Sequence, residues 1–133
     1  MAQKQQVPDS LKNWFIVHFI ADMLFAIPLF FIPETFLSVL GWKTIDPITT
    51  RMVAAALFGI GIESLLSRNA TVDSFKTMLS LKIIWSLSAV VGLTIALINN
   101  LYTYKTVGIS LLAIFAGFNF LWSYWFIALK KNN

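Results

Sequence analysis

Apolar residues in this chain gather in four stretches that are separated by shorter, more polar segments. The hydrocarbon core of a bilayer is about 30 Å thick and a helix rises about 1.5 Å per residue, so about 20 helical residues cross it. Each stretch meets this length: the four run from about residue 11 to 32, 47 to 66, 73 to 98 and 106 to 129. The pattern predicts an all-α fold, a four-helix transmembrane bundle of up-down-up-down topology, as a single integral membrane domain over residues 1–133.

The connection between the first two stretches predicts a short interfacial helix. Pro33 suits the first turn of a helix, and Gly41 suits the position just after its last turn. The apolar residues between them fall on one face, as expected for a helix that lies on the membrane surface. Asp46-Pro47 then predicts the start of the second span, because an acidic N-cap followed by proline favours a first helical turn.

The third and fourth spans have their own boundary signals. Either Thr71 or Asp73 can cap the start of the third span, and Asn99-Asn100 predicts its end. The fourth span is expected to start at Thr103 or Thr106. These short connections favour antiparallel neighbouring helices.

Composition agrees with lipid as the solvent of this chain. Hydrophobic residues make up 58% of it and charged residues 12%, whereas soluble domains carry about 25% charge. A soluble globule with so few charges would expose large apolar patches and aggregate. The chain has no cysteine and a single histidine, which argues against a transition-metal site. No sequence motif indicates a cofactor.

The basic residues favour an orientation and argue against nucleic acid as a partner. Nearly all of them lie in tails, in loops or near span ends, with Lys82 within a span as the exception, and they form no basic stripe. Six lie on the side that holds both termini: Lys4, Lys12, Arg68, Lys76, Lys130 and Lys131. Three lie on the opposite side: Lys43, Arg51 and Lys105. The positive-inside rule therefore predicts a multi-pass cell-membrane protein with both termini cytoplasmic.

Several polar and ionisable residues lie at membrane depth. Counted from Trp14 at the inner interface, Asp22 is about 12 Å deep, and similar counts on other spans place Lys82 and Asn119 at a comparable depth. A charge at this depth is costly, so such groups face the bundle interior and pair. We expect Lys82 to pair with Asp22 or Glu63 in a polar layer of the inner half of the bundle. The candidate ligand-binding residues are Asp22, Glu63, Lys82, Asn119, His18 and Trp85.

Three functions are consistent with this polar layer. The first is binding of a small ligand or cation, because two acids and one base leave a net negative charge and Trp85 supplies an aromatic wall. The second is a structural or accessory subunit, in which buried ion pairs only fix helix neighbours. The third is a lipid-modifying membrane enzyme that uses a carboxylate or His18 as an acid–base group. No catalytic residue is identified, and the sequence favours a protein that is not an enzyme.

Small residues recur at four-residue spacing in three spans. Ser88, Gly92 and Ala96 form one such ridge; Ala55 with Gly59 and Ala113 with Gly117 form shorter ones. Such ridges let helix backbones approach closely in lipid. We expect them to pack within the bundle or, for Ser88, Gly92 and Ala96, to form a contact between copies of the chain.

The first half of the chain resembles a group of small four-span prokaryotic membrane proteins of uncharacterised function, the DoxX-like proteins. The resemblance rests on the sequence PETFLSVLG at residues 33–41, on Asp46-Pro47 and on RMVA at residues 51–54. It implies a four-helix membrane bundle and transfers no catalytic residue.

Overall fold

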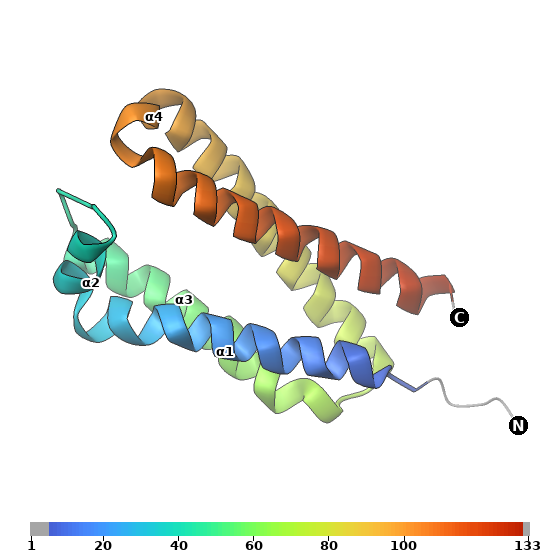
Figure 1. The fold of residues 1–133 in the computed structure, drawn as a ribbon. Coiled ribbons are helices and arrows are strands. Elements are labelled where there is room, and N and C mark those ends of the chain that lie inside the picture. Colours follow the sequence, from blue (N-terminus) through green and yellow to red (C-terminus); the bar gives the residue numbers. More distant parts are fainter. Residues whose placement is uncertain (1–5, 132–133) are drawn as a thin grey trace, which may run out of the picture. The chain divides into compact units, whose positions relative to one another are not determined.

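The computed structural model describes residues 6–131, and for residues 100–104 its backbone alone. The helical elements are α1 (Asp9–Phe31), α2 (Pro33–Val39), α3 (Pro47–Leu66), the short 3-10 helix η1 (Ser67–Asn69) and α4 (Val72–Lys131). No strand occurs among the described residues. The predicted all-α fold with four long apolar helical stretches is therefore confirmed (Figure 1).

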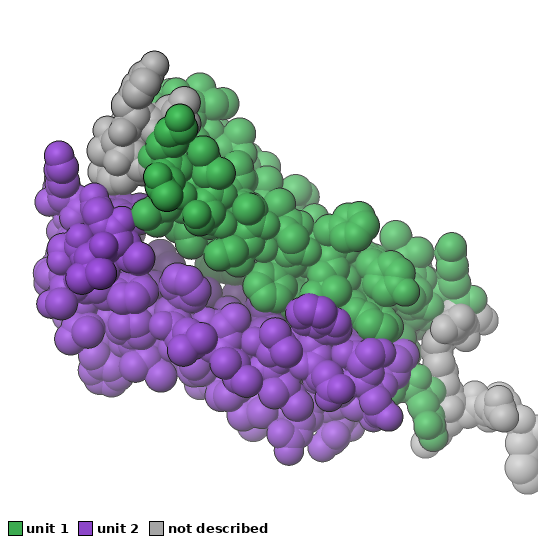
Figure 2. Space-filling model, in the orientation of Figure 1, with its two compact units in different colours: residues 1–7, 70–133 green, residues 8–69 purple. Residues whose placement is uncertain are grey.

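The described chain forms two compact units (Figure 2). Residues 8–69 hold α1, α2, α3 and η1, and we call this unit the N-terminal hairpin. Residues 6–7 and 70–131 hold α4, and we call this unit the C-terminal hairpin. Each is described by itself below.

In the N-terminal hairpin, the signals between α1 and α3 act as the sequence predicts. Pro33 is the first residue of α2, and Gly41 ends it with a positive φ of 93°. The Gly41 N–H donates to Ser38 O at 3.0 Å and the Trp42 N–H to Leu37 O at 2.9 Å, which is a Schellman motif. Glycine adopts this left-handed conformation without a steric cost. The chain can therefore turn sharply before α3.

Asp46 and Arg51 fix the start of α3 against the end of α1. The Asp46 carboxylate accepts from the Ile48 N–H at 3.0 Å, and Pro47 follows as the first helical residue. Arg51 Nε donates to Phe30 O at 3.1 Å, in the last turn of α1. A cation at a helix C-terminus is favourable because the carbonyls there carry partial negative charge. Arg51 therefore links α3 to α1, in addition to being one of the basic residues predicted to lie on the side opposite the termini.

α1 and α3 each bury one stripe of residues at spacings of three or four. That spacing keeps side chains on one face of a helix and is typical of helix–helix packing. The buried residues of α1 are Leu11, Phe15, His18, Asp22, Ala26 and Leu29. Those of α3 are Thr50, Ala54, Leu57, Gly61 and Ser64. Both stripes include small or polar residues at their centre, and this places polar atoms where the two helices meet.

The C-terminal hairpin consists of α4 alone, which folds back on itself near its middle (Figure 1). Two stretches of it are long and apolar enough to span a membrane, Val72–Asn99 and Lys105–Lys131, and we call them the first and second arms. These two spans end and restart close to the predicted limits, but the predicted break in the helix between them is wrong, because α4 is helical from Val72 to Lys131. Neither glycine nor proline occurs from Asn99 to Thr106 to stop it.

Caps and small residues also shape α4. Of the two predicted caps, Thr71 is the one observed: its hydroxyl accepts from the Ser74 N–H at 3.4 Å. Beyond the reversal, Gly108 faces Leu97 of the first arm, and a Cβ at Gly108 would lie 2.6 Å from Leu97 Cδ2. The missing side chain therefore lets the two arms approach closely.

Four helical stretches are long and apolar enough to cross a membrane: Asp9–Phe31, Pro47–Asn69, Val72–Asn99 and Lys105–Lys131. Large apolar side chains such as Leu24 (68% exposed) and Phe120 (78% exposed) lie on their outer faces. Exposed apolar surface on this scale is typical of a protein whose solvent is lipid. The length and composition of the helices are those of a multi-pass membrane protein.

Candidate functional site

The N-terminal hairpin brings together two of the predicted site residues, His18 and Asp22, on one face of α1. Their separation of four residues is one helical turn, and Nδ1 of His18 lies 3.1 Å from Oδ2 of Asp22. Both residues are buried, with exposed fractions of 6% and 7%. The sequence predicted this shared face correctly.

The Asp22 oxygen nearest the imidazole has no hydrogen bond. Oδ2 is fully enclosed and has no hydrogen bond, although Nδ1 of His18 lies within ion-pair distance. Among the described side chains, only Asp22 and Trp125 contain a buried polar atom of this kind. An enclosed carboxylate oxygen without a donor costs several kcal/mol, more than a neutral indole N–H. Asp22 is therefore the group whose charge is least compensated by hydrogen bonding.

Gly61 of α3 lies against Asp22. A Cβ added to Gly61 would lie 2.8 Å from Asp22 Cβ and 3.1 Å from Asp22 Oδ2. A Cβ at Gly59, two residues earlier on α3, would meet no atom within 4 Å. The sequence singled out Ala55 with Gly59 as a contact ridge, but Gly61 makes the close approach. Gly61 lies seven residues after Ala54, on the buried stripe of α3, and that spacing was the signal for it.

Glu63 does not join this pair. It follows Gly61 by two residues, which is about 200° around a helix, and its side chain is exposed. Its Oε1 accepts a hydrogen bond from the Ser67 hydroxyl at the end of α3. The depth of Glu63 along α3 was estimated from the sequence, whereas its direction depends on which face of α3 packs against α1.

The C-terminal hairpin brings together Asn119, Ser86 and Lys82. Asn119 Nδ2, on the second arm, donates to Ile83 O at 3.0 Å and to Ser86 Oγ at 2.9 Å on the first arm. Ser86 Oγ donates in turn to Lys82 O at 2.7 Å. These hydrogen bonds connect the two arms, and we call the group formed by Asn119, Ser86 and Ile83 O the amide clasp. The predicted common depth of Lys82 and Asn119 agrees with this arrangement.

Lys82 is buried, with 3% exposed, and its Nζ lies 5.3 Å from the centroid of the Trp122 ring. This is a cation–π distance. Trp122 stacks on Phe118, with ring centroids 5.6 Å apart. The aromatic wall was expected from Trp85, which is half-buried, whereas the ring next to Lys82 Nζ is that of Trp122. Its position three residues after Asn119, on the same face of the helix, was the signal for its role.

The expected pairing of Lys82 with Asp22 or Glu63 stays a prediction, because the residues belong to different units. Within the described residues, no group of three or more His, Asp or Glu side chains is arranged to hold a metal ion. Comparison with protein-family models, with curated proteins and with solved structures gave no match. The resemblance to DoxX-like proteins therefore also stays a prediction.

The ridge of Ser88, Gly92 and Ala96 lies on an exposed face of the first arm. A Cβ at Gly92 would meet no atom within 4 Å. The shorter ridges of Ala55 with Gly59 and Ala113 with Gly117 are exposed as well. The residues of all three ridges are thus exposed in the part of the chain that the structure describes.

Proposed function

We propose that this multi-pass membrane protein takes up and releases a proton at the pair formed by Asp22 and His18. The observation that carries the proposal is the enclosed Oδ2 of Asp22: this oxygen has no hydrogen bond, and it lies 3.1 Å from Nδ1 of His18. A proton is the cation that a single carboxylate can hold, and an imidazole beside it can donate or accept a hydrogen bond. With the proton on the carboxyl group and His18 neutral, the pair carries no net charge, which suits an apolar surrounding.

The ionisable groups on the neighbouring elements of the N-terminal hairpin support this assignment. All four are exposed, whereas His18 and Asp22 are buried: they are Glu34 of α2, Arg51 and Glu63 of α3, and Arg68 of η1. Arg51 donates to Phe30 O and Glu63 accepts from Ser67. The pair of His18 and Asp22 is therefore set apart from these four groups by its burial.

Infrared spectroscopy of the protein in lipid bilayers tests the proposal. A protonated carboxyl group whose carbonyl has no hydrogen bond absorbs at a higher frequency than one bonded to water. We expect a high-frequency carboxyl band in the unmodified protein during an acid titration, its loss in Asp22→Asn, and its retention in Glu63→Gln. Glu63→Gln is the matched control because it removes an exposed membrane-segment carboxylate. A band that persists in Asp22→Asn would contradict the proposal.

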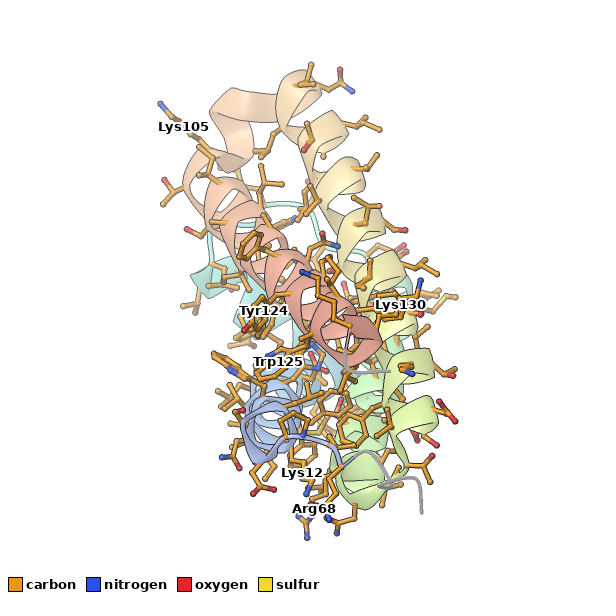
Figure 3. The ribbon with its side chains drawn as sticks, turned by 90° about the vertical axis from the view of Figure 1, so that its right-hand side faces the viewer. Lys12, Arg68, Lys105, Tyr124, Trp125 and Lys130 are labelled. Carbon is orange, nitrogen blue, oxygen red and sulfur yellow. The ribbon has the colours of Figure 1, made fainter. Side chains whose placement is uncertain are left out.

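We propose further that both termini face the cytoplasm of the cell. Lys12 and Arg68 lie at the same end of the N-terminal hairpin, and Lys105 and Lys130 lie at opposite ends of the second arm (Figure 3). The chain has no cysteine, so single cysteines at Lys12 and Lys105 report each side by reaction with a thiol reagent that does not cross membranes. In intact cells, we expect labelling of Lys105→Cys and not of Lys12→Cys. Labelling of Lys12→Cys alone would show that the orientation is the opposite of the one proposed.

A second candidate function is that of a subunit that associates through the ridge of Ser88, Gly92 and Ala96. It is supported by the exposure of all three residues and by the open space at Gly92. Without other cysteines, Ser88→Cys should form a disulfide between two chains in the membrane under oxidation. Thr94→Cys is the control, because Thr94 is exposed and lies two residues, or about 200° around the helix, beyond Gly92. Equal cross-linking at both positions would count against this interface.

A further inference from the structure

Gly61 provides the surface on α3 that covers the carboxyl group of Asp22. The nearest atom to its absent side chain is Asp22 Cβ, and the same position lies 3.1 Å from Oδ2. We infer that Gly61 is the positioning residue of the proton site: its missing side chain brings the α3 backbone against Asp22 and keeps water from Oδ2. This inference rests on the proposed proton-binding function.

The clash that a larger residue would make falls on a rigid part of α1. Asp22 Cβ is attached to the helix backbone, so a Cβ at 2.8 Å from it cannot be accommodated by a side-chain rotation alone. The Met23 Cε atom, at 2.9 Å from the same position, belongs to a flexible side chain and can move aside. An alanine at position 61 therefore separates α1 from α3 at the level of Asp22.

The burial of Asp22 makes this separation of α1 from α3 chemically important. Oδ2 is enclosed and has no hydrogen bond, so water that entered between the helices would be its first donor. A proton on a carboxyl group that water reaches exchanges with solvent quickly, whereas an enclosed one exchanges only when the structure opens. The Gly61 contact thus determines how readily the site exchanges its proton with solvent.

Hydrogen–deuterium exchange of the Asp22 carboxyl proton tests the role of Gly61. The high-frequency band assigned by its loss in Asp22→Asn shifts when deuterium replaces the proton, so its shift after transfer to heavy water gives the exchange rate. We expect exchange in Gly61→Ala to be at least about tenfold faster than in the unmodified protein. Gly59→Ala is the matched control, because it makes the same change on the same helix into open space. Its rate should equal that of the unmodified protein.

The outcomes separate the two proposals. If the band that Asp22→Asn removes is never observed, the proton site itself is wrong. If the band is present but exchanges at one rate in all three proteins, the proton site stands and the role of Gly61 is overturned. If Gly61→Ala does not fold, the unmodified protein decides: slow exchange supports enclosure of the proton, and complete exchange at the first time point overturns it.

Discussion

The two hairpins hold polar side chains among apolar neighbours in different ways. In the C-terminal hairpin, the amide of Asn119 donates to both Ile83 O and Ser86 Oγ, and Ser86 donates onward to Lys82 O. In the N-terminal hairpin, Asp22 lies against a glycine and its Oδ2 has no hydrogen bond. The amide clasp satisfies its donors, whereas the carboxylate keeps an acceptor without a donor.

This difference separates a structural group from a functional candidate. The neutral amide of Asn119 uses both of its donors to link two helix segments and has no N–H left to donate to a ligand. A carboxylate enclosed without a donor is costly unless it gains a proton or a partner, so its persistence in a helix interface points to function. The predictions below examine the two hairpins by the same measurement, the free energy of unfolding in detergent.

The largest effect is expected at Gly61. Gly61→Ala overpacks the contact between α3 and Asp22 and should lower the free energy of unfolding by about 1–3 kcal/mol. Gly59→Ala meets no neighbour and should be neutral, or stabilising by up to about 1 kcal/mol, because alanine is the better helix former. Chemical unfolding followed by circular dichroism measures both. Equal effects of the two variants would mean that α1 and α3 do not meet closely at Asp22.

A smaller effect is expected at the amide clasp. Asn119→Leu removes both hydrogen bonds to the first arm and should lower the free energy of unfolding by about 1 kcal/mol, the size measured for interhelical hydrogen bonds in membranes. Ser110→Ala is the control, because the Ser110 hydroxyl donates only to Thr106 O within the second arm, at 2.9 Å. A clasp that contributes nothing would leave Asn119→Leu as stable as Ser110→Ala.

A still smaller effect is expected at Arg51. Arg51→Ala removes the hydrogen bond to Phe30 O between α3 and the end of α1. Because Arg51 is exposed and solvent screens its charge, the loss should be about 0.5–1 kcal/mol. Lys43→Ala, which changes an exposed cation in the preceding loop, serves as the control. If the two variants unfold alike, the Arg51 contact does not stabilise the hairpin.

The smallest effect is a pH dependence at Asp46. The hydrogen bond from the Thr49 hydroxyl, and then that from the Ile48 N–H, hold the pKa of Asp46 below its ordinary value. The stabilisation is therefore fully present above the pKa of the unfolded chain and is lost as the pH falls through the folded pKa. The difference in melting temperature between the unmodified protein and Asp46→Ala should shrink on acidification. A difference that grows instead would contradict this sign.

The sequence predicted positions along the helix axes better than directions around them. The lengths of the apolar stretches and the caps at Asp46 and Gly41 follow from local rules, and the structure has them. Depth also follows, because a helix rises by a fixed amount per residue. Glu63 was placed at a sensible depth, but its face of α3 is turned away from Asp22. That direction depends on the packing partner, which one helix's residues do not specify.

The same reason explains the residues that the sequence interpretation missed. Gly61 and Trp122 each occur in an apolar span where glycines and aromatic residues are frequent, so composition alone does not distinguish them. Their roles follow from the contact with Asp22 and with Lys82. The continuous helix of α4 was missed because Asn99-Asn100 was interpreted as a helix stop, although asparagine disfavours a helix interior by only a fraction of a kcal/mol.

The titration of His18 tests the central claim most directly. His18 is the only histidine of the chain, so its imidazole nitrogen resonances in a nitrogen-15 NMR spectrum of the protein in lipid are unique. If Asp22 takes up a proton beside His18, the imidazole titration curve should change in Asp22→Asn but stay unchanged in Glu63→Gln. A curve for Asp22→Asn that superimposes on that of the unmodified protein would contradict the account.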